Sequence, residues 1–416
     1  MHHPRSLSEI VDNGLCLGCG LCQAIAGRDQ VAMDWVDPPG RLRPVIRQRL
    51  DEASERAILA TCPGMRLDGA PDPVRHADTV AVDPAFGPWI RVWKGHARDE
   101  SIRHMASSGG ALTALAIHLL EGGTVDFISH VRADENRPMR SRSHVSRTRD
   151  DVLAAAGSRY GPVAPLDRFT ELLDEGRPFA VIGKPCDISG VHNYARHDPR
   201  VSELVRATLA FSCGTFADLD CSRQMLERVG FPGGAGGEEN LSLFRYRGYG
   251  YPGPTRAVDG DGRVFDEDYL DFWYGPQGWT FQFRCRICAD PTGETTDITV
   301  ADAWPGGTPE TNEEGGWSTF VSRTGRGDAL MQEAIDAGVL VVEEHDISLM
   351  HEVQPHQVEK KQAINARLEA MAEGGCIMPD FRHLNLDEAA AQRDHVFHRT
   401  NRDGMRERLS RGLNRE

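Results

Sequence analysis

The sequence predicts a mixed α/β fold (α/β or α+β), with a small cysteine-rich unit before it and a helical region after it. Between about residues 76 and 345, apolar runs typical of strands alternate with amphipathic segments, which is the order of a βαβ architecture. Three closely spaced cysteines precede this region, and the pattern after residue 346 is mostly that of amphipathic helix. We therefore expect three parts, at residues 1–75, 76–345 and 346–416.

Composition excludes several classes of protein. The chain has 416 residues, enough for two or three domains, and its net charge of −15 without a Lys/Arg run argues against nucleic-acid binding. The first residues lack the pattern of a signal peptide, and the longest apolar stretch, ALTALAIHLL, is about half a membrane span. We expect a cytoplasmic protein that does not span a membrane, in which the ten cysteines stay reduced and bind metal rather than form disulfides.

Half of a ferredoxin motif lies near the N-terminus. Three cysteines stand at intervals of three in GLCLGCGLC (residues 14–22), and a Cys-Pro pair follows in TCPG (residues 61–64). In two-cluster bacterial ferredoxins, three such cysteines and a distant Cys-Pro bind one 4Fe-4S cluster. A zinc knuckle is the alternative, but zinc sites favour pairs of ligands. We predict a ferredoxin-like domain with one 4Fe-4S cluster, and its expected ligands are Cys16, Cys19, Cys22 and Cys62.

A second set of four cysteines is spread along the middle of the chain. Cys186 (in VIGKPCD) and Cys213 (in AFSCG) each follow an apolar run, and Cys285 and Cys288 form a close pair in CRICAD. Residues that follow neighbouring parallel strands meet at one edge of a sheet. We therefore predict a four-thiolate site assembled across the fold, which leaves Cys221 and Cys376 as ordinary thiols.

Two loops have residues suited to a phosphate-bearing ligand, although neither of them is specific. The SSGG run at 107–110 stands before an expected helix, whose first N–H groups attract anions; an ordinary serine cap is the alternative. Lys184 follows an expected strand and suits either a ligand phosphate or a plain surface charge. The turn SRYGPV carries Ser158, Arg159 and Tyr160, and the aromatic stretch at 268–283 suits either a flat substrate or a core.

Taken in order, these motifs resemble one known family. SSGGALTAL, GKPCD, FSCG, the CRICAD–TDITVADAW block and SRTGRG are similar to the coenzyme F420 hydrogenase/dehydrogenase beta-subunit family across residues 90–345, and many members carry the same ferredoxin half before them. The family includes 7-hydroxymethyl chlorophyll a reductase and ferredoxin-dependent divinyl chlorophyllide 8-vinyl reductase. This chain departs from the Gly-Asp form of some members at residues 301–304, which are Ala-Asp-Ala-Trp.

The resemblance implies FAD beside two 4Fe-4S clusters. The second cluster would be held by Cys186, Cys213, Cys285 and Cys288. The flavin would be lined by Ser107, Ser108, Gly109, Gly110, Ser158, Tyr160, Gly183, Lys184 and Pro185.

Two functions fit these cofactors. The first is a reductase that takes electrons from ferredoxin and reduces an unsaturated or cyclic small molecule, such as a tetrapyrrole, with His192, Tyr160 or Tyr194 as proton donor. The alternative is an electron-transfer beta subunit that uses coenzyme F420 within a hydrogenase or dehydrogenase complex. A zinc-stapled binding module is a third, non-enzymatic reading. The protein could be a complex subunit or a homo-oligomer, and the C-terminal helices could dock a partner or pack on the main domain.

Overall fold

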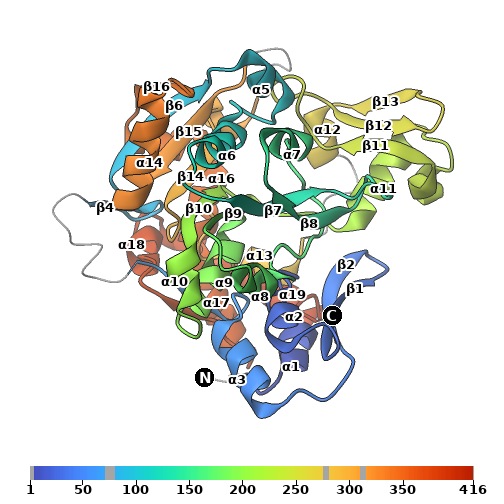
Figure 1. The fold of residues 1–416 in the computed structure, drawn as a ribbon. Helices are drawn as coiled ribbons and strands as arrows, with labels where there is room; N and C mark the ends of the chain where they lie inside the picture. Colours follow the sequence, from blue (N-terminus) through green and yellow to red (C-terminus); the bar gives the residue numbers. More distant parts are fainter. Residues whose placement is uncertain (1–3, 71–79, 275–280, 310–314, 416) are drawn as a thin grey trace.

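A central sheet of eight strands organises the molecule (Figure 1). The computed structural model describes residues 4–70, 80–274, 281–309 and 315–415. The strand order is β16-β6-β15-β14-β10-β9-β7-β8, with β14, β10, β9 and β7 parallel and the other pairings antiparallel. The strands are β6 (Arg91–Ala97), β7 (Phe127–Ala133), β8 (Ser141–Ser146), β9 (Phe179–Gly183), β10 (Val205–Phe211), β14 (Ile298–Asp302), β15 (Ser318–Ser322) and β16 (Leu340–Glu344).

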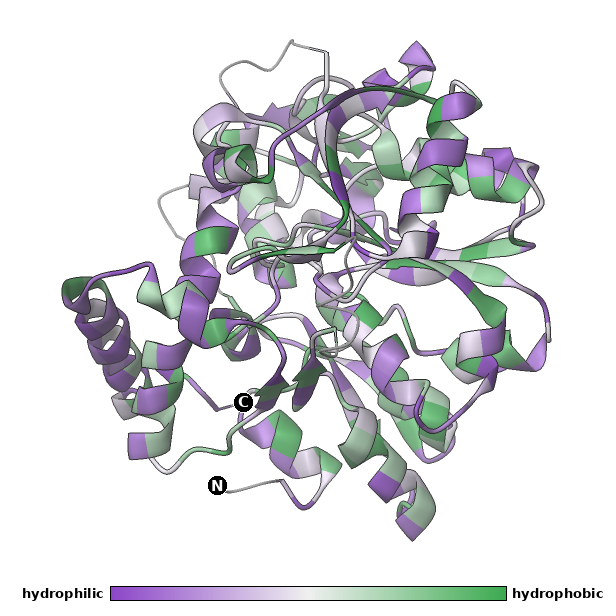
Figure 2. Cartoon of the chain, turned by 90° about the vertical axis from the view of Figure 1, so that its left-hand side faces the viewer, coloured by the Kyte–Doolittle hydropathy of each residue, from purple (hydrophilic) through white to green (hydrophobic). Residues whose placement is uncertain are grey.

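Helices cover both faces of this sheet, because successive side chains of its strands point to opposite faces and are apolar on both. In β9, Ala180 packs into the core on one face, whereas Phe179 and Val181 pack into the core on the other. The first core is completed by α6 (Ala111–Glu121), α7 (Arg149–Ala154) and α14 (Gly325–Asp336). The second is completed by α8 (Phe169–Asp174), α9 (Pro185–Tyr194) and α10 (Arg200–Leu204). Figure 2 shows the hydrophobic strands inside and more hydrophilic helices around them. The predicted α/β fold class is confirmed.

The N-terminal part is a small unit of helices and a hairpin below the sheet (Figure 1). It contains α1 (Leu7–Asp12), α2 (Leu21–Ala26), β1 (Val31–Val36), β2 (Arg41–Ile46), α3 (Glu52–Thr61) and β3 (Arg66–Asp68). Ser6 and Asp51 cap α1 and α3 by accepting hydrogen bonds from first-turn N–H groups. Two short strands, β4 (Ala81–Asp83) and β5 (Gly87–Trp89), form a hairpin after residues 71–79, which lie outside the described part.

The chain segment that connects β10 to β14 contains a separate three-stranded meander beside the main sheet. Its strands are β11 (Leu241–Arg245), β12 (Thr255–Asp259) and β13 (Val264–Glu267). The DGDG sequence at residues 259–262 forms the turn that joins β12 to β13, and Asp259 accepts hydrogen bonds from the N–H groups of Asp261 and Arg263. The neighbouring elements are α5 (Glu100–Met105), α11 (Leu219–Arg228), η1 (Gly234–Asn240), α12 (Tyr269–Tyr274), α13 (Phe283–Arg286) and η2 (Pro305–Gly307).

The C-terminal region is helical, as predicted, and it packs against the N-terminal unit. It contains α15 (Ile347–Val353), α16 (Pro355–Gln362), α17 (Ile364–Glu373), β17 (Asp380–Arg382), α18 (Leu386–Ala391) and α19 (His395–Ser410). Strand β17 pairs in parallel with β3, and one core joins Ile10, Phe283 and Met371. The amphipathic pattern around Val358 and Ile364 is divided between α16 and α17, because the helix breaks at Ala363. The three-part division of the chain remains a prediction.

Within the described ranges, no helix is both long and apolar enough to cross a membrane.

Candidate functional site

The four N-terminal cysteines come together as predicted by their spacing. Cys16, Cys19, Cys22 and Cys62, hereafter the N-terminal cysteine group, line one small cavity of about 20 Å³ between α1, α2 and α3. The loop between them takes its shape from Gly20, whose φ is 85° and where a Cβ would stand 2.8 Å from Asp167. The N–H of Gly18 donates to the Cys16 sulfur at 3.4 Å, which is the backbone contact expected around a cluster ligand.

Electrostatics show how closely these thiols are grouped. Burial raises the pKa of Cys19, and the neighbouring Cys62 and Cys22 thiols raise it further. Burial together with Cys16 raises the pKa of Cys62 to about 11. Four buried thiols that repel one another in their ionised forms need a bound cation to become thiolates, which is the chemistry of a metal centre.

The second set of cysteines also converges, at the carboxyl edge of the parallel strands. Cys186 lies in the first turn of α9 after β9, Cys213 follows β10, and Cys285 and Cys288 lie in and just after α13. We call these four the inner cysteine group. Burial and then Asp187 raise the pKa of Cys186, with further contributions from Cys213 and Cys288. Burial raises the pKa of Cys213 to about 12, and the Cys285 and Cys288 thiols add to this although Lys360 opposes it.

The spacing within each group differs from that of a single-ion site. Across the described ranges, no three His, Cys, Asp or Glu side chains stand close enough together to hold one metal ion. A 4Fe-4S cluster sets a different requirement, because its four thiolate ligands stand around the corners of a cube.

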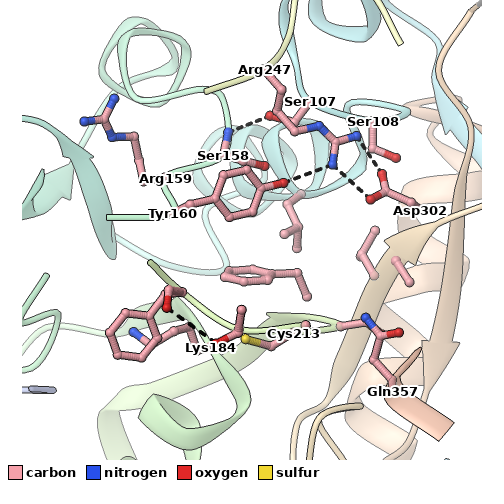
Figure 3. A pocket seen from close by; sticks show the side chains of 18 of the residues that line it. Ser107, Ser108, Ser158, Arg159, Tyr160, Lys184, Cys213, Arg247, Asp302 and Gln357 are labelled. Atoms are coloured by element: carbon pink, nitrogen blue, oxygen red, sulfur yellow. Dashed lines mark hydrogen bonds and ion pairs between the residues drawn. The ribbon is translucent and has the colours of Figure 1, made fainter. Parts of the chain in front are cut away.

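A large cavity lies against the inner cysteine group (Figure 3). Its volume is about 720 Å³, and it opens at the carboxyl ends of β9, β10 and β14, where open α/β sheets bind ligands. Cys213 and Cys285 form part of its wall. Seven of the nine residues predicted for the flavin also line it: Ser107, Ser108, Gly110, Ser158, Tyr160, Gly183 and Lys184.

Gly109 and Pro185 do not line this cavity. The glycine and the serine hydroxyls of the SSGG loop also have other roles than the predicted contact with a ligand. A Cβ on Gly109 would meet the Gly95 carbonyl oxygen at 2.9 Å, so this glycine permits packing on the sheet rather than approach of a ligand. The Ser108 hydroxyl donates to the Trp317 carbonyl at 2.9 Å. The Ser158 N–H donates to the Ser107 hydroxyl at 2.5 Å, which ties the loop to the SRYG turn. The hydroxyls therefore fix the loop, and the start of α6 faces the cavity.

Lys184 is committed to an ion pair inside the protein. Its ammonium lies 2.7 Å from Asp187, and the two side chains are 11% and 1% exposed. Burial alone would lower the pKa of Lys184, but Asp187 and the thiols of Cys186 and Cys213 raise it above its ordinary value. Lys184 thus places a fixed positive charge beside the inner cysteine group, and it is not the surface charge considered above.

An ion pair that the sequence analysis did not identify lies on the side of the cavity opposite Lys184. The Arg247 guanidinium, only 3% exposed, donates to both carboxylate oxygens of Asp302 at 2.9 Å and to the Tyr160 hydroxyl at 3.3 Å. It lies over the rings of Trp304 and Tyr269. Figure 3 shows Tyr160, Arg247 and Asp302 on one side of the space and Lys184 and Cys213 on the other. The repeated aromatic and basic residues of RYRGYGY were the available signal, but a strand has the same composition.

The proposed proton donors separate clearly in the structure. Tyr160 lines the cavity, whereas His192 does not and lies instead on α9 near Asp297 and Thr295. Burial lowers the pKa of His192, and its Nε2 is buried without a hydrogen-bond partner in the described structure. His192 therefore lies outside the cavity, and of the three donors considered only Tyr160 lines it. Tyr194 packs against Phe169 in the core below the sheet.

The C-terminal helices contribute part of the cavity wall. Gln354, Gln357 and Lys360 reach it from α16 and the residue before it, and Arg367 reaches it from α17. The Lys360 ammonium donates to the Gly214 carbonyl, next to Cys213. This region is thus a structural part of the site rather than only an outer layer. Of the aromatic stretch at 268–283, Tyr269 and Trp273 line the cavity, and residues 275–280 lie outside the described part.

Comparison with known families agrees with this arrangement. The sequence model described as "Coenzyme F420 hydrogenase/dehydrogenase, beta subunit N-term" matches residues 92–169, and that described as the C terminus of the same subunit matches residues 176–348. The chain belongs to the coenzyme F420 hydrogenase/dehydrogenase beta-subunit family.

Individual members of this family are distant relatives. The chain is 25% identical to the coenzyme F420 hydrogenase subunit beta of Methanococcus voltae over 279 residues, which cover 61% of this chain and 84% of the relative. It is 22% identical to an uncharacterized protein of Methanocaldococcus jannaschii over 81% of this chain and 91% of that protein. It is 23% identical to the coenzyme F420-dependent sulfite reductase of M. jannaschii over 78% of this chain, but only 46% of that longer enzyme is matched.

A solved structure shares the fold. A chain of the F420-reducing [NiFe] hydrogenase complex of Methanosarcina barkeri superposes with a TM-score of 0.55 at 21% identity. The match covers 98% of that chain and 72% of this one. The family match ends at residue 348, so α16, α17 and α19 lie beyond it although they line the cavity.

Proposed function

We propose that this protein is an F420-linked iron–sulfur flavoprotein, an electron-transfer subunit that connects two 4Fe-4S clusters through FAD to coenzyme F420. The observation that carries the proposal is that Cys213 and Cys285 stand in the wall of the cavity lined by the predicted flavin residues. One-electron and two-electron centres would therefore be in direct proximity. Membership of the family makes an oxidoreductase role the expected one.

The two cysteine groups fit 4Fe-4S clusters in number, burial and charge. Each has four thiols whose mutual repulsion calls for a bound metal centre, and in the N-terminal cysteine group a backbone N–H also donates to sulfur. The N-terminal cysteine group would hold one cluster and the inner cysteine group the other. These assignments rest on geometry and on the spacing of the cysteines.

The cavity fits a flavin in size and in lining. Ligand sites of cofactor size commonly occupy about 300–1,000 Å³ and combine apolar walls with a few placed polar groups, as this one does. The first N–H groups of α6 face the cavity and suit a phosphate. When bound, a flavin exchanges single electrons with iron–sulfur centres and delivers two as a hydride.

The protein's own side chains would orient the ligands and exclude water. Tyr160, Tyr269, Trp273 and Trp304 form an aromatic wall suited to stacking a flat ring. The Arg247–Asp302 ion pair places a positive charge and a negative charge side by side next to that wall. Tyr160 carries a hydroxyl that can hold or donate a proton to a ring bound there.

The relatives named above favour the F420-linked reading over the ferredoxin-dependent reductase reading. Three of the four are titled as F420 hydrogenase or F420-dependent proteins, and none is titled as a tetrapyrrole reductase. The chlorophyll-type substrate considered from the sequence therefore finds no support, and F420, which exchanges two electrons as a hydride, replaces ferredoxin as the proposed electron partner.

The decisive experiment is anaerobic purification followed by analysis of iron, sulfide, zinc and flavin per chain. We expect about eight iron, about eight sulfide and one FAD. Reduced F420 is then mixed with the protein, and bleaching of flavin and cluster absorbance is followed by stopped flow; reduced ferredoxin is the control donor. Zinc without flavin would overturn the cofactor assignment. Bleaching by ferredoxin but not by reduced F420 would overturn the F420 link alone.

A further inference from the structure

A buried arginine stands between the two cysteine groups. Arg284 precedes Cys285 in α13 and is 1% exposed, one of the largest fully buried side chains described. Its nearest electrostatic partners are four cysteines that belong to both groups, namely Cys288, Cys186, Cys285 and Cys62. The guanidinium therefore faces both proposed cluster sites at once.

The hydrogen bonds of Arg284 join the two turns that carry these cysteines. Its guanidinium donates to the Gly64 carbonyl at 2.7 Å and to the Pro63 carbonyl at 3.3 Å, in the turn directly after Cys62. It also donates to the Ile287 carbonyl at 2.9 Å, between Cys285 and Cys288. The ring of Phe381, on β17, lies 4.9 Å from the guanidinium carbon and packs against it. The side chain is thus locked between the N-terminal, central and C-terminal parts of the chain.

The charge of Arg284 has an unusual environment. Its hydrogen-bond acceptors in the described structure are all backbone carbonyls, and the ionisable groups that act on it most strongly are the four cysteines rather than carboxylates. An uncompensated buried cation is strongly destabilising. Four thiolates around an iron–sulfur cluster supply net negative charge, so the two proposed clusters would provide the missing compensation.

Arg323 shows what a buried arginine without this role looks like. It is also 1% exposed and also donates to backbone carbonyls, at Pro88 and Thr292. The charged groups that act on it are the carboxylates of Asp290, Glu294 and Asp83, and no cysteine is among them. The two arginines therefore match in burial and in donating to backbone carbonyls, although Arg323 also donates to the Thr299 hydroxyl, and they differ in the ionisable groups that they face.

We propose that Arg284 is a positioning residue for electron transfer between the two iron–sulfur sites, an inference that rests on the proposed function. It holds the Cys62 turn and the Cys285–Cys288 turn at a fixed separation, and its charge stabilises an added electron at either site. The step that it serves oxidises one site and reduces the other by one electron, with no proton or bond transferred. Neighbouring charges and hydrogen bonds are the protein's means of setting such potentials.

The test compares R284Q with R323Q in the intact anaerobic protein. Midpoint potentials of both clusters are measured by redox titration followed by EPR, and the rate of electron transfer between the clusters is measured after flash reduction. In R284Q, we expect both potentials to shift to lower values and the rate to fall about tenfold. In R323Q, we expect wild-type potentials even if thermal stability falls.

Several outcomes would overturn the proposal. R284Q with unchanged potentials, or with a shift at only one cluster, removes the bridging role. If R284Q does not fold, R284K takes its place, because lysine keeps the positive charge. In R284K, we expect both cluster potentials to stay near the wild-type values and the EPR lines to broaden, since the geometry is less fixed. Lowered potentials in R284K would contradict the charge argument. The fully reduced wild type must also show magnetic interaction between two clusters, and two independent spectra would refute the arrangement.

Failure of the proposed function is separable from failure of this inference. The potentials and the EPR spectra are recorded with chemical reductants and do not involve F420. A wild-type protein that contains both clusters but does not react with F420 would refute the F420 link and leave the Arg284 comparison readable. A wild-type protein with fewer than two clusters would refute both.

Discussion

The two cysteine groups each bring four cysteines together, but they do so with different parts of the chain. The N-terminal cysteine group takes three ligands from one glycine-containing loop and the fourth from a turn after α3, and it encloses about 20 Å³ among apolar side chains such as Leu7, Ile10 and Ile58. The inner cysteine group takes its ligands from three separate segments and adjoins a cavity of about 720 Å³. One group is local and enclosed, whereas the other is assembled by the sheet and open to a ligand.

The difference in charge between the groups has a functional consequence. Two lysines, Lys184 and Lys360, act on the inner cysteine group together with the carboxylate of Asp187, whereas the N-terminal cysteine group is affected by its own thiols, by Asp187 and, at Cys62, by Arg284. Positive charge near a cluster stabilises its reduced form. We therefore expect the inner site to have the higher reduction potential, so that electrons collect beside the cavity.

The largest expected effect comes from removing one ligand in each group. Cys285→Ser and Cys19→Ser should each lose about four iron per chain, because each removes one 4Fe-4S cluster. Only Cys285→Ser should also release flavin, since Cys285 stands in the cavity wall. Iron, sulfide and flavin analysis of the anaerobic variants checks this.

Cys376→Ser is the matched control, because Cys376 belongs to neither group and contacts the Asn414 side chain near the C-terminus. It should keep all iron and flavin. If Cys285→Ser kept its full iron content, the inner ligand set would be wrong; if Cys19→Ser lost all flavin, the contrast between an enclosed and an open site would fail.

The second prediction concerns the ion pair beside the inner cysteine group. Lys184→Met leaves the carboxylate of Asp187 buried and unpaired, and breaking such a pair costs about 3–5 kcal/mol. Urea denaturation under anaerobic conditions measures the loss. The double variant K184M/D187N should recover most of it, because the unpaired charge is then absent. A single variant as stable as the wild type would show that Lys184 adds no net stability, and equal losses in both variants would point to packing instead.

Much of the fold was predictable because it is local. The apolar runs at β9, β10 and β14 and the glycine-rich loop before α6 have patterns that short-range rules read correctly. The cysteines of the inner group also follow from strand order, since Cys186 and Cys213 each come after a parallel strand. Chemistry placed at strand ends can be read from the sequence once the sheet is parallel.

The rest depended on contacts between distant segments. Arg247 and Asp302 stand 55 positions apart and meet because a loop after β11 crosses the end of β14. Two of the carbonyl acceptors of Arg284, at Pro63 and Gly64, are more than 200 positions before it. His192 was proposed from residue type alone, but its helix turns it toward Asp297 and away from the cavity. Side-chain direction of this kind has no one-dimensional pattern.

The third prediction is a pH dependence that originates on the cavity side of the molecule. Burial, with His144 and Arg132 adding positive charge, lowers the pKa of His130 to about 4, although Asp151 opposes the shift. An unfolded histidine titrates near about 6.5, so between these values the unfolded state binds more protons and stability falls as pH falls. The contribution is complete above about pH 6.5 and decreases by about 3 kcal/mol at about pH 4.

Unfolding free energies measured across this pH range check the prediction. His130→Gln is the informative variant, because an amide can keep a hydrogen bond to the Ser146 hydroxyl, now 2.7 Å from the ring nitrogen, but does not titrate. The variant should lose this part of the acid sensitivity. An unchanged pH profile in the variant would assign the sensitivity to other groups.

The smallest expected effect tests whether the open site recognises its ligand through the Arg247–Asp302 pair. Arg247→Lys keeps the charge but cannot reproduce the two parallel bonds to Asp302 or the stacking on Trp304. We expect the KM for F420 to rise about tenfold, which is about 1.4 kcal/mol, with little change in kcat. Iron content should stay at the wild-type value, because the side-chain bonds of this pair go to Tyr160 and to each other and not to either cysteine group. The matched control is Arg256→Lys, which alters an exposed two-bond pair with Asp266 on β12 and β13. An equal rise in KM in both variants, or a loss of iron in Arg247→Lys alone, would show that the Arg247–Asp302 pair supports the fold and does not bind the ligand.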